Sequence, residues 1–381
     1  MPMILPARQF GALRLADVLT SSLAALAGKQ NVFSLPPVEK AVVVLADGLG
    51  VSAIKARAGH ARFLATRLTK SAVIEGVFPA TTVAGIASLT TGVQPGQHGL
   101  VGYKVRDADN DRVVNQLSGW DEGMQPATWQ RATTVFERSA AVGVPSFAIG
   151  PKRFYGSGFS QAALRGATYL SAESIADRFA MARRVLDTTP RALIYLYVAE
   201  LDIAAHAFGW ESPKWLAQLE ILDGELARFE SGLGATEGLL VTADHGVIDV
   251  PSTKHILFDT VPSLVAHVRH IGGDPRCLHL YLEAGLADGA ADVLAECWRD
   301  TEADRAWVFT RDEAIEAGLF GPVADEVRPR IGDVIVAARK LVAYYDSRET
   351  NQAPRSMVGQ HGSLTDEEVR IPLIRAGAFA V

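Results

Sequence analysis

The stretch that decides the fold is residues 41–48, AVVVLADG, in which an unbroken apolar run leads directly into an aspartate and a glycine. Such a run is typical of a parallel strand that is covered on both faces of its sheet. Residues 193–198, LIYLYV, and 239–244, LLVTAD, have the same apolar character. Parallel strands end at one edge of a sheet, where open α/β folds bind ligands. We therefore expect the polar residues that follow these runs to converge.

Strand-like and helix-like segments alternate through the first two thirds of the chain. The strand-like segments are 41–46, 72–77, 146–149, 192–198 and 239–242, and the helix-like segments are 13–26, 51–70, 82–91, 162–186 and 213–231. Alternation of this kind indicates βαβ units. The sequence therefore predicts an α/β fold of three layers, with a mostly parallel sheet sandwiched between helices.

The pattern changes after residue 249. Residues 276–282 alternate between polar and apolar positions, 290–299 have a helical pattern, and 330–338 resemble another strand. We interpret residues 256–354 as an α+β insertion subdomain with a small sheet of its own. Residues 1–255 and 355–381 would then form the core.

Composition excludes several classes of protein. The chain has 381 residues, 48% of them hydrophobic, and a net charge of −6. This charge argues against binding to nucleic acid polymers, which normally requires a basic surface. The sequence shows no apolar run of about 18 residues, as a membrane-spanning helix would need, and no signal-peptide pattern at its start. We expect a cytoplasmic protein that does not associate with membranes.

Aspartates and histidines follow the apolar runs, and another histidine lies near the C-terminus. Asp202 and His206 are four residues apart, so both face the same way on a helical turn. The candidate ligands are Asp47, Asp202, His206, Asp244, His245 and His361. Each alone is a weak signal, but carboxylates and imidazoles gathered at one sheet edge are typical of a site for divalent cations such as zinc. Manganese accepts the same nitrogen and oxygen ligands.

A hydroxyl nucleophile is available where residues 78–83, FPATTV, pass from a strand into a helix. Thr81 and Thr82 lie near the expected start of that helix, where the positive end of the dipole and free backbone N–H groups can bind phosphate oxygens. The ordinary alternative is a threonine that merely caps the helix. Coordination to a dication would make such an alcohol a competent nucleophile.

In the order of these residues the chain resembles the alkaline phosphatase superfamily, and within it most closely the type I phosphodiesterase/nucleotide pyrophosphatase family. The resemblance covers residues 40 to 375 and is most specific in the segments FPxxT (78–82), LxTG (89–92), HG (98–99), TADHG (242–246) and GQHG (359–362). It implies two metal sites, normally occupied by zinc. Asp202, His206 and His361 would hold one ion, and Asp47, Asp244, His245 and the Thr82 oxygen would hold the other.

The resemblance also implies hydrolysis of a small phosphoester through a phosphothreonine intermediate at Thr82, with Thr81 as the second candidate. A phosphomonoesterase or phosphonate hydrolase of the same superfamily, and a metal-binding module without catalysis, are the alternatives. The chain departs from the family pattern at two positions. Tyr103 stands where an asparagine usually binds phosphate, and Val83 where an aromatic residue often stacks on a nucleobase. Other aromatic residues that could line a pocket are Trp120, Phe154 and Tyr155.

Overall fold

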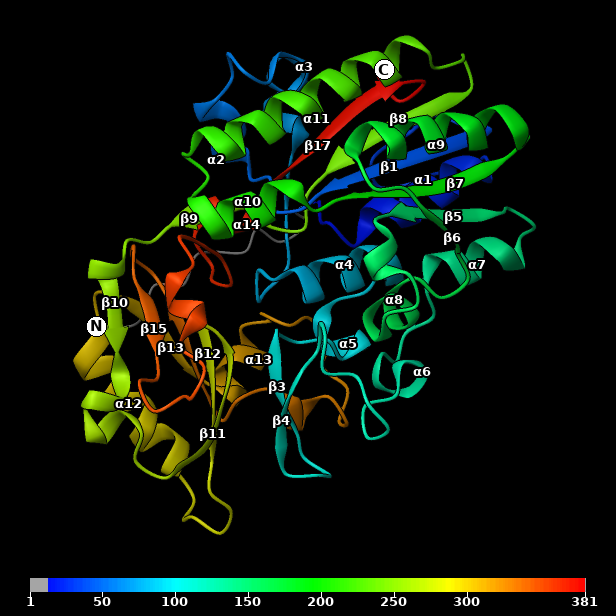
Figure 1. Cartoon of the computed structure of the whole chain (residues 1–381). Helices are drawn as coiled ribbons and strands as arrows, with labels where there is room; N and C mark the ends of the chain where they lie inside the picture. The colour runs from blue at the N-terminus through cyan, green and yellow to red at the C-terminus, as the bar shows by residue number, and fades with distance from the viewer. Residues whose placement is uncertain (1–12, 381) are drawn as a thin grey trace.

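The computed structural model of the protein describes residues 13–380 and is built around a seven-stranded sheet (Figure 1). The order of its strands is β2-β17-β8-β1-β7-β5-β6. Their bounds are β1 Lys40–Ala46, β2 Val73–Glu75, β5 Ser146–Gly150, β6 Thr168–Ser171, β7 Ala192–Val198, β8 Glu237–Thr242 and β17 Arg370–Gly377. The long apolar runs of the sequence form the middle of the sheet, where both faces are buried.

Most of this sheet is parallel. Strands β8, β1, β7, β5 and β6 pair in parallel, and β17 and β2 add two antiparallel strands at one side. In the central register Leu45 lies beside both Tyr197 and Thr242, so β1, β7 and β8 end together. The predicted mostly parallel fold is confirmed, whereas the sequence analysis did not anticipate β6 and β17.

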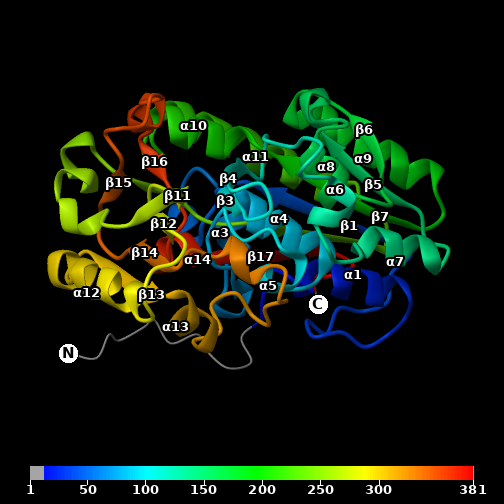
Figure 2. The same ribbon diagram turned by 90° about the horizontal axis from the view of Figure 1, so that it is seen from below.

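Helices cover both faces of the sheet and complete the three layers. In Figure 2, α1 and α7 lie on the lower side of strands β1 and β7, and α9 and α11 lie on the upper side. The helices of the first face are α1 Asp17–Leu26, α4 Thr82–Thr91 and α7 Val135–Ala141, and those of the other are α2 Val51–Ala56, α3 Arg62–Arg67, α9 Ile175–Thr188 and α11 Pro213–Ser231. None of the helices within residues 13–380 has the length and apolar character needed to cross a bilayer.

Two of the predicted helices are divided in the structure. The segment 51–70 forms α2 and α3 with a turn between them, and 162–186 contains the end of α8 Gly158–Ala163, then β6, then α9. Gly166 prevents segment 162–186 from forming one helix, because its φ is +88° and a Cβ there would lie 2.6 Å from the backbone nitrogen of Glu137. Ser174 then starts α9 by capping its first turn.

A second, antiparallel sheet of four strands lies beside the edge at which β1 and β7 end (Figure 1). Its order is β11-β12-β14-β13, and its elements are β11 Val268–Asp274, β12 Cys277–Leu282, β13 Ala306–Thr310 and β14 Val334–Ala338, with helices α12 Ala290–Glu302 and α13 Arg311–Glu316. One set of its residues, including Phe309 and Ile335, packs into the main core, whereas Trp298 belongs to a separate apolar cluster. These elements fall within 256–354, the range that we propose as the insertion subdomain.

Short elements connect the two sheets. Strands β9 and β16 pair next to helix α10, and the β3–β4 hairpin contacts β11. The bounds of the remaining elements are α5 Pro95–His98, α6 Pro126–Trp129, α10 Glu200–Phe208, α14 Asp366–Val369, β3 Lys104–Asp107, β4 Arg112–Asn115, β9 Ile248–Asp249, β10 His255–Leu257, β15 Ala343–Tyr345 and β16 Gly359–Gln360.

Candidate metal centre

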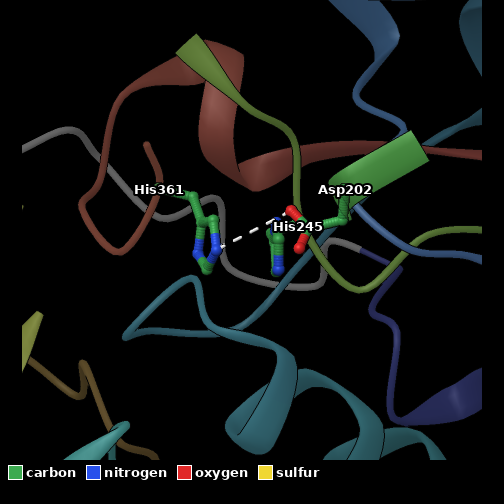
Figure 3. Close-up of side chains that lie close together, drawn as sticks. All are labelled: Asp202, His245 and His361. Atoms are coloured by element: carbon green, nitrogen blue, oxygen red, sulfur yellow. Dashed lines mark ion pairs between the residues drawn. The ribbon is translucent and has the colours of Figure 1, made fainter. Parts of the chain in front are cut away.

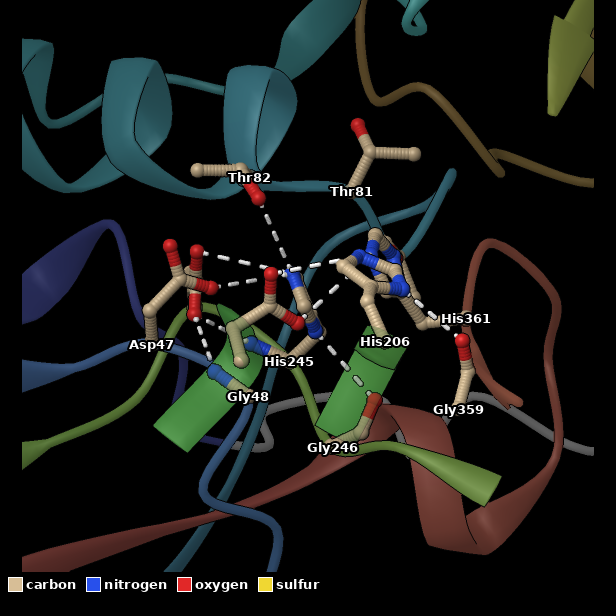
Figure 4. Close-up of polar contacts among 12 residues, drawn as sticks. Asp47, Gly48, Thr81, Thr82, His206, His245, Gly246, Gly359 and His361 are labelled. Atoms are coloured by element: carbon tan, nitrogen blue, oxygen red, sulfur yellow. Dashed lines mark hydrogen bonds and ion pairs between the residues drawn. The ribbon is translucent and has the colours of Figure 1, made fainter. Parts of the chain in front are cut away.

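The six predicted ligands converge at the carboxyl edge of the central sheet. Figure 4 shows four of them, Asp47, His206, His245 and His361. Asp47 directly follows β1, and Asp244 and His245 follow the neighbouring strand β8. Helix α10, which comes after β7, carries Asp202 and His206. The sixth ligand, His361, follows β16 in the last part of the chain.

Asp47, Asp244 and His245 form one group of potential ligands. A ligand atom from each lies within 4.8 Å of the other two, and all three residues are buried. The Nε2 atom of His245 is 3.4 Å from Asp47 Oδ1 and 3.6 Å from Asp244 Oδ2. Two carboxylates and an imidazole at this spacing suit a single divalent cation, whose bonds to such ligands are about 2.0–2.2 Å long.

A second group contains Asp202, His245 and His361, again with ligand atoms within 4.8 Å of one another (Figure 3). His206 adjoins this group, because its Nε2 lies 3.2 Å from Asp202 Oδ2 and 3.3 Å from His361 Nε2. The rings of His245 and His361 stack with their centroids 3.7 Å apart. His245 therefore belongs to both groups and makes them one continuous centre.

Backbone carbonyl groups fix the orientation of the three imidazoles. The Nδ1 atom of His206 is 2.8 Å from Gly359 O, and that of His361 is 2.9 Å from Ala80 O. The Nδ1 atom of His245 is 3.2 Å from the neighbouring Gly246 O. A carbonyl oxygen can only accept, so each Nδ1 donates. This arrangement leaves each Nε2 atom to face the centre, as is usual for a metal-ligating histidine.

Three carboxylates of the centre have a buried oxygen without a hydrogen-bond partner. Asp47 Oδ1, Asp202 Oδ1 and Asp244 Oδ2 are buried without any hydrogen-bond partner. An unpaired charge inside a protein is costly unless a counter-charge or a metal ion balances it. The residues present therefore fit a bound dication, which would satisfy these oxygens.

The pKa values within the centre lead to the same conclusion. Burial raises the pKa of Asp47 well above its usual value, and the charges of Asp244 and Asp202 raise it further, although the Tyr197 hydroxyl donates to its Oδ2 and opposes the shift. Burial also opposes the charged forms of Asp202 and His206, but their mutual attraction outweighs it, lowering the pKa of Asp202 and raising that of His206 to about 9. Without an ion, the centre compensates by holding protons.

This electrostatic conflict predicts that Asp47→Asn stabilises the metal-free protein. The substitution removes a buried carboxyl that is costly either as a charge or as a group protonated above its usual pKa, and we expect a gain of about 1–3 kcal/mol, the usual cost of a buried polar group without a partner. Because the pKa of Asp47 is raised in the folded state, its carboxyl is neutralised as the pH falls, and the advantage of the variant should shrink. Denaturant unfolding of chelator-treated protein at pH 5 and pH 8 measures this difference. A variant less stable than wild type at pH 8 would contradict the prediction.

The structure distinguishes the two candidate nucleophiles. Thr81 is the N-cap of α4, and its hydroxyl accepts a hydrogen bond of 3.3 Å from the backbone N–H of Ala84. Thr82 is the first residue of the helix, and its Oγ1 lies 3.2 Å from His245 Nε2 (Figure 4). Only Thr82 of the two directs its hydroxyl at the cluster of potential ligands, while Thr81 takes the capping role.

Two cavities meet at Thr82. The first, of about 340 Å³, extends toward the second sheet and is also lined by Asp202, His206 and His361. The second, of about 470 Å³, is mostly apolar and is lined by aromatic side chains that include Trp120, Phe154 and Tyr197. Tyr103 and Val83, the two positions that depart from the family pattern, line the first cavity. Tyr155, the remaining aromatic candidate, is 66% exposed.

Sequence reasoning missed two residues of the site. Tyr197 lies within the apolar run of β7, and its hydroxyl donates to Asp47 from the neighbouring strand. Asp274 ends β11 and lines the first cavity, although it is far from the other site residues in the sequence. The local signal for Tyr197 was weak, because the apolar run of β7 also contains Tyr195, and Asp274 follows the two glycines of a hairpin.

Comparison with known proteins identifies a family and several similar folds. The family model for type I phosphodiesterase/nucleotide pyrophosphatase matches residues 41–364. No curated protein sequence matches the chain. Murine ectonucleotide pyrophosphatase/phosphodiesterase 5 has a similar structure, with a TM-score of 0.67 and 18% identity over 89% of this chain and 88% of that chain. An inactive variant of the same murine protein in complex with AMP gives a TM-score of 0.68 at 18% identity, with 89% and 88% covered.

A further similar structure is phosphonoacetate hydrolase from Sinorhizobium meliloti 1021 in complex with phosphonoacetate. It has a TM-score of 0.67 and 18% identity over 90% of this chain and 91% of that chain. These similarities show a shared fold. Because the family model spans most of the sequence, the chain belongs to the type I phosphodiesterase/nucleotide pyrophosphatase family.

Proposed function

We propose that the protein hydrolyses small phosphodiesters at a centre for two divalent cations, with Thr82 as the nucleophile. One observation carries this proposal. The Thr82 hydroxyl lies 3.2 Å from Nε2 of His245, the residue shared by two groups of potential metal ligands whose carboxylates have unpartnered oxygens. A hydroxyl in this position can react with a phosphoryl group that is held at the same centre.

The residues divide into two ligand sets. Asp202, His206 and His361 would hold one ion, and Asp47, Asp244 and His245 the other, with the Thr82 hydroxyl as an additional ligand. Zinc suits this mixture of nitrogen and oxygen ligands, and manganese can also use it. When bound, the ions supply positive charge that stabilises a threonine alkoxide and the transferring phosphoryl group. Burial keeps the pKa of His361 well below its ordinary value, so its ring is neutral, as a ligand must be.

The reaction divides into two displacements at phosphorus. In the first, Thr82 Oγ1 forms a bond to phosphorus while the bond to the leaving alcohol breaks, and the proton of the hydroxyl ends on the departing oxygen. The product is a phosphothreonine that keeps the second ester group. In the second, water enters from the side that the alcohol has left, cleaves the bond between phosphorus and Oγ1, and restores the hydroxyl. The N-terminus of α4 directs the positive end of its dipole at the negative phosphoryl oxygens.

The two cavities support a diester as the substrate. A diester carries two organic groups, and Thr82 lies where a cavity of about 340 Å³ meets another of about 470 Å³. The limited volume of both favours small substituents over a polymer. Phosphonate hydrolysis is the second candidate, because Arg153 lines the second cavity and offers a cation to an anionic substituent. The structural similarity to phosphonoacetate hydrolase gives this alternative some support.

A rate comparison tests the proposal. We expect kcat/KM for bis(p-nitrophenyl) phosphate to exceed that for p-nitrophenyl phosphate by about tenfold or more, since a missing substituent removes about 1–3 kcal/mol of binding in the transition state. Phosphonoacetate serves as the third substrate, and chelator as the control for metal dependence. A higher rate with the monoester or with phosphonoacetate would contradict the proposal. No turnover by zinc-loaded protein with any of the three would favour a binding module.

A further inference from the structure

One acidic residue of the first cavity has no role in the proposed reaction. Among residues 13–380, four aspartates have a buried carboxylate oxygen without a hydrogen-bond partner. Three of them, Asp47, Asp202 and Asp244, are the proposed metal ligands. The fourth is Asp274, which lines the same cavity as Thr82 and His206. Burial raises the pKa of Asp274 to about 7, although the nearby positive charges of His206 and Lys104 and the backbone N–H of Tyr103 oppose the shift.

The β11–β12 hairpin brings Asp274 to the centre. Gly273 has a φ of +81°, and a Cβ there would lie 2.0 Å from the Cys277 carbonyl oxygen, so the turn is tight enough to require glycine. The hairpin packs against the loop that carries His361, because a Cβ on Gly362 would lie 3.4 Å from the Cβ of Asp274. The Oδ2 atom of Asp274 is buried and has no hydrogen-bond partner within residues 13–380, so it is a free acceptor.

A buried ion pair holds this hairpin in place. Arg276, two residues after Asp274, donates from Nε to Glu368 Oε1 at 2.9 Å and from Nη2 to Glu368 Oε2 at 2.7 Å. Glu368 Oε1 also accepts a hydrogen bond of 3.0 Å from the backbone N–H of Ser363, two residues after His361. The carboxylate of Asp274 is thus fixed relative to the proposed metal ligands, and such preorganisation favours recognition of a bound group.

The other acidic residues around the first cavity already have partners. Asp346 Oδ2 pairs with Arg348 Nη2 at 2.8 Å, and Glu349 Oε1 lies 3.5 Å from Lys104 Nζ. Apart from the proposed ligand Asp202, Asp274 is therefore the acidic residue of this cavity that keeps a free acceptor. It lies close enough to His206, a member of the proposed Asp202, His206 and His361 ligand set, for the two charges to interact. In the proposed reaction the leaving oxygen lies on that side, because displacement at phosphorus places it opposite Thr82.

We propose that Asp274 is a specificity-determining residue that accepts a hydrogen bond from a hydroxyl or ammonium group on the leaving alcohol of the substrate. This inference rests on the proposed function and adds a substrate class to it. The preferred substrates are esters of amino alcohols or of polyols, whose donor group lies a few bonds from the ester oxygen. A plain alkyl alcohol would leave the buried Oδ2 atom without a partner, and substrates of that kind are discriminated against at such sites.

The test uses monoesters of phenylphosphonic acid, in which the phenyl group is joined to phosphorus through carbon and only one ester bond can break. The leaving alcohols are 2-aminoethanol, ethylene glycol and n-propanol, which are similar in size and differ in the terminal group. Release of phenylphosphonate gives kcat/KM for wild type and for Asp274→Asn. Asp346→Asn serves as the matched control, because Asp346 lines the same cavity but is already paired with Arg348.

We expect wild type to prefer the 2-aminoethyl ester to the n-propyl ester, and Asp274→Asn to reduce that preference by about tenfold to a hundredfold, the range for a hydrogen bond to a charged group. The preference for the 2-hydroxyethyl ester over the n-propyl ester should fall by a smaller factor, because asparagine keeps an acceptor oxygen. Rates with the n-propyl ester should stay within about threefold of wild type, within the range of a small change in local packing. Asp346→Asn should leave all three ratios unchanged.

Three outcomes would overturn the inference: no preference in wild type, unchanged ratios in Asp274→Asn, or equal losses for all three esters, which would indicate an effect on the metal centre or on folding. Asp274→Ala, checked by thermal unfolding, repeats the comparison without any acceptor. The p-nitrophenyl ester of phenylphosphonic acid separates this inference from the proposed function. If wild type hydrolyses that ester but the ratios do not respond, the role of Asp274 alone is refuted, whereas no turnover of it refutes the proposed function as well.

Discussion

Replacement of Thr82 by alanine is expected to lower kcat/KM for a phosphodiester by about 10³-fold or more, the scale seen when an enzyme loses its nucleophile. The hydroxyl lies 3.2 Å from His245 Nε2, and no change in binding can replace the bond that its oxygen forms to phosphorus. The fold should tolerate the substitution, because the hydroxyl that caps α4 belongs to Thr81. The comparison requires equal metal content in both proteins, measured by elemental analysis.

Two variants serve as controls for this prediction. Thr82→Ser keeps a hydroxyl and should retain part of the activity, while Thr81→Ala should cost about 1 kcal/mol of stability through loss of the cap. The activity of Thr81→Ala should stay within about threefold of wild type, because a lost cap acts on stability and not on the reaction. Acid quenching during turnover, followed by mass spectrometry, should locate the phosphoryl group on Thr82. Full activity in Thr82→Ala, or a phosphoryl group on Thr81, would contradict the assignment.

Removal of divalent cations is expected to have the second largest effect. Exhaustive chelation should lower kcat/KM by about 10³-fold or more, since bound ions contribute several kcal/mol of charge stabilisation in reactions of this kind. Zinc or manganese added back should restore activity. The same ions should raise the melting temperature, because they bind the folded state and relieve the conflict among Asp47, Asp202 and Asp244.

A substitution of one proposed ligand tests whether the metal needed for activity is bound at this centre and not elsewhere on the protein. Asp244→Asn should reduce the bound metal by about one equivalent, because Asp244 belongs to a single ligand group. The loss of activity should be similar to the loss caused by chelation. His255→Ala is the control, since that ring packs against Tyr345 and is not among the proposed ligands. Undiminished turnover after chelation to background metal content would refute the metal-dependent mechanism.

The central fold was predictable from the sequence because its signal is local. The apolar runs of β1, β7 and β8 are too continuous for a half-exposed sheet, and they form buried strands that end together. Helices α4 and α11 have the predicted bounds, because a capping hydroxyl or a proline defines each start. The polar residues after the strands could also be identified, since carboxylates and imidazoles at the ends of buried strands have few structural roles.

The errors arose where local pattern and tertiary packing disagree. The segment 162–186 has enough apolar residues for one long helix, but Gly166 lies against the backbone of Glu137 and a short edge strand forms instead. Strand β17 pairs with β8 although more than 120 residues separate the two strands in the sequence. No local feature of the sequence predicts that this pairing is antiparallel. The affinity of one strand for another depends on register and burial, which only the assembled sheet provides.

The sequence by itself determined the class of fold, the kinds of ligand and the presence of a hydroxyl near them, because periodicity and residue chemistry are properties of short segments. Only the tertiary structure showed that His245 joins the two groups of potential ligands, that Asp274 lines the cavity beside them, and that Thr82, which the family resemblance favours, faces these groups while Thr81 caps the helix. These three results depend on distances of a few ångströms between residues far apart in the chain. Such distances are fixed by the packing of helices and strands against one another, for which no single segment carries a signal.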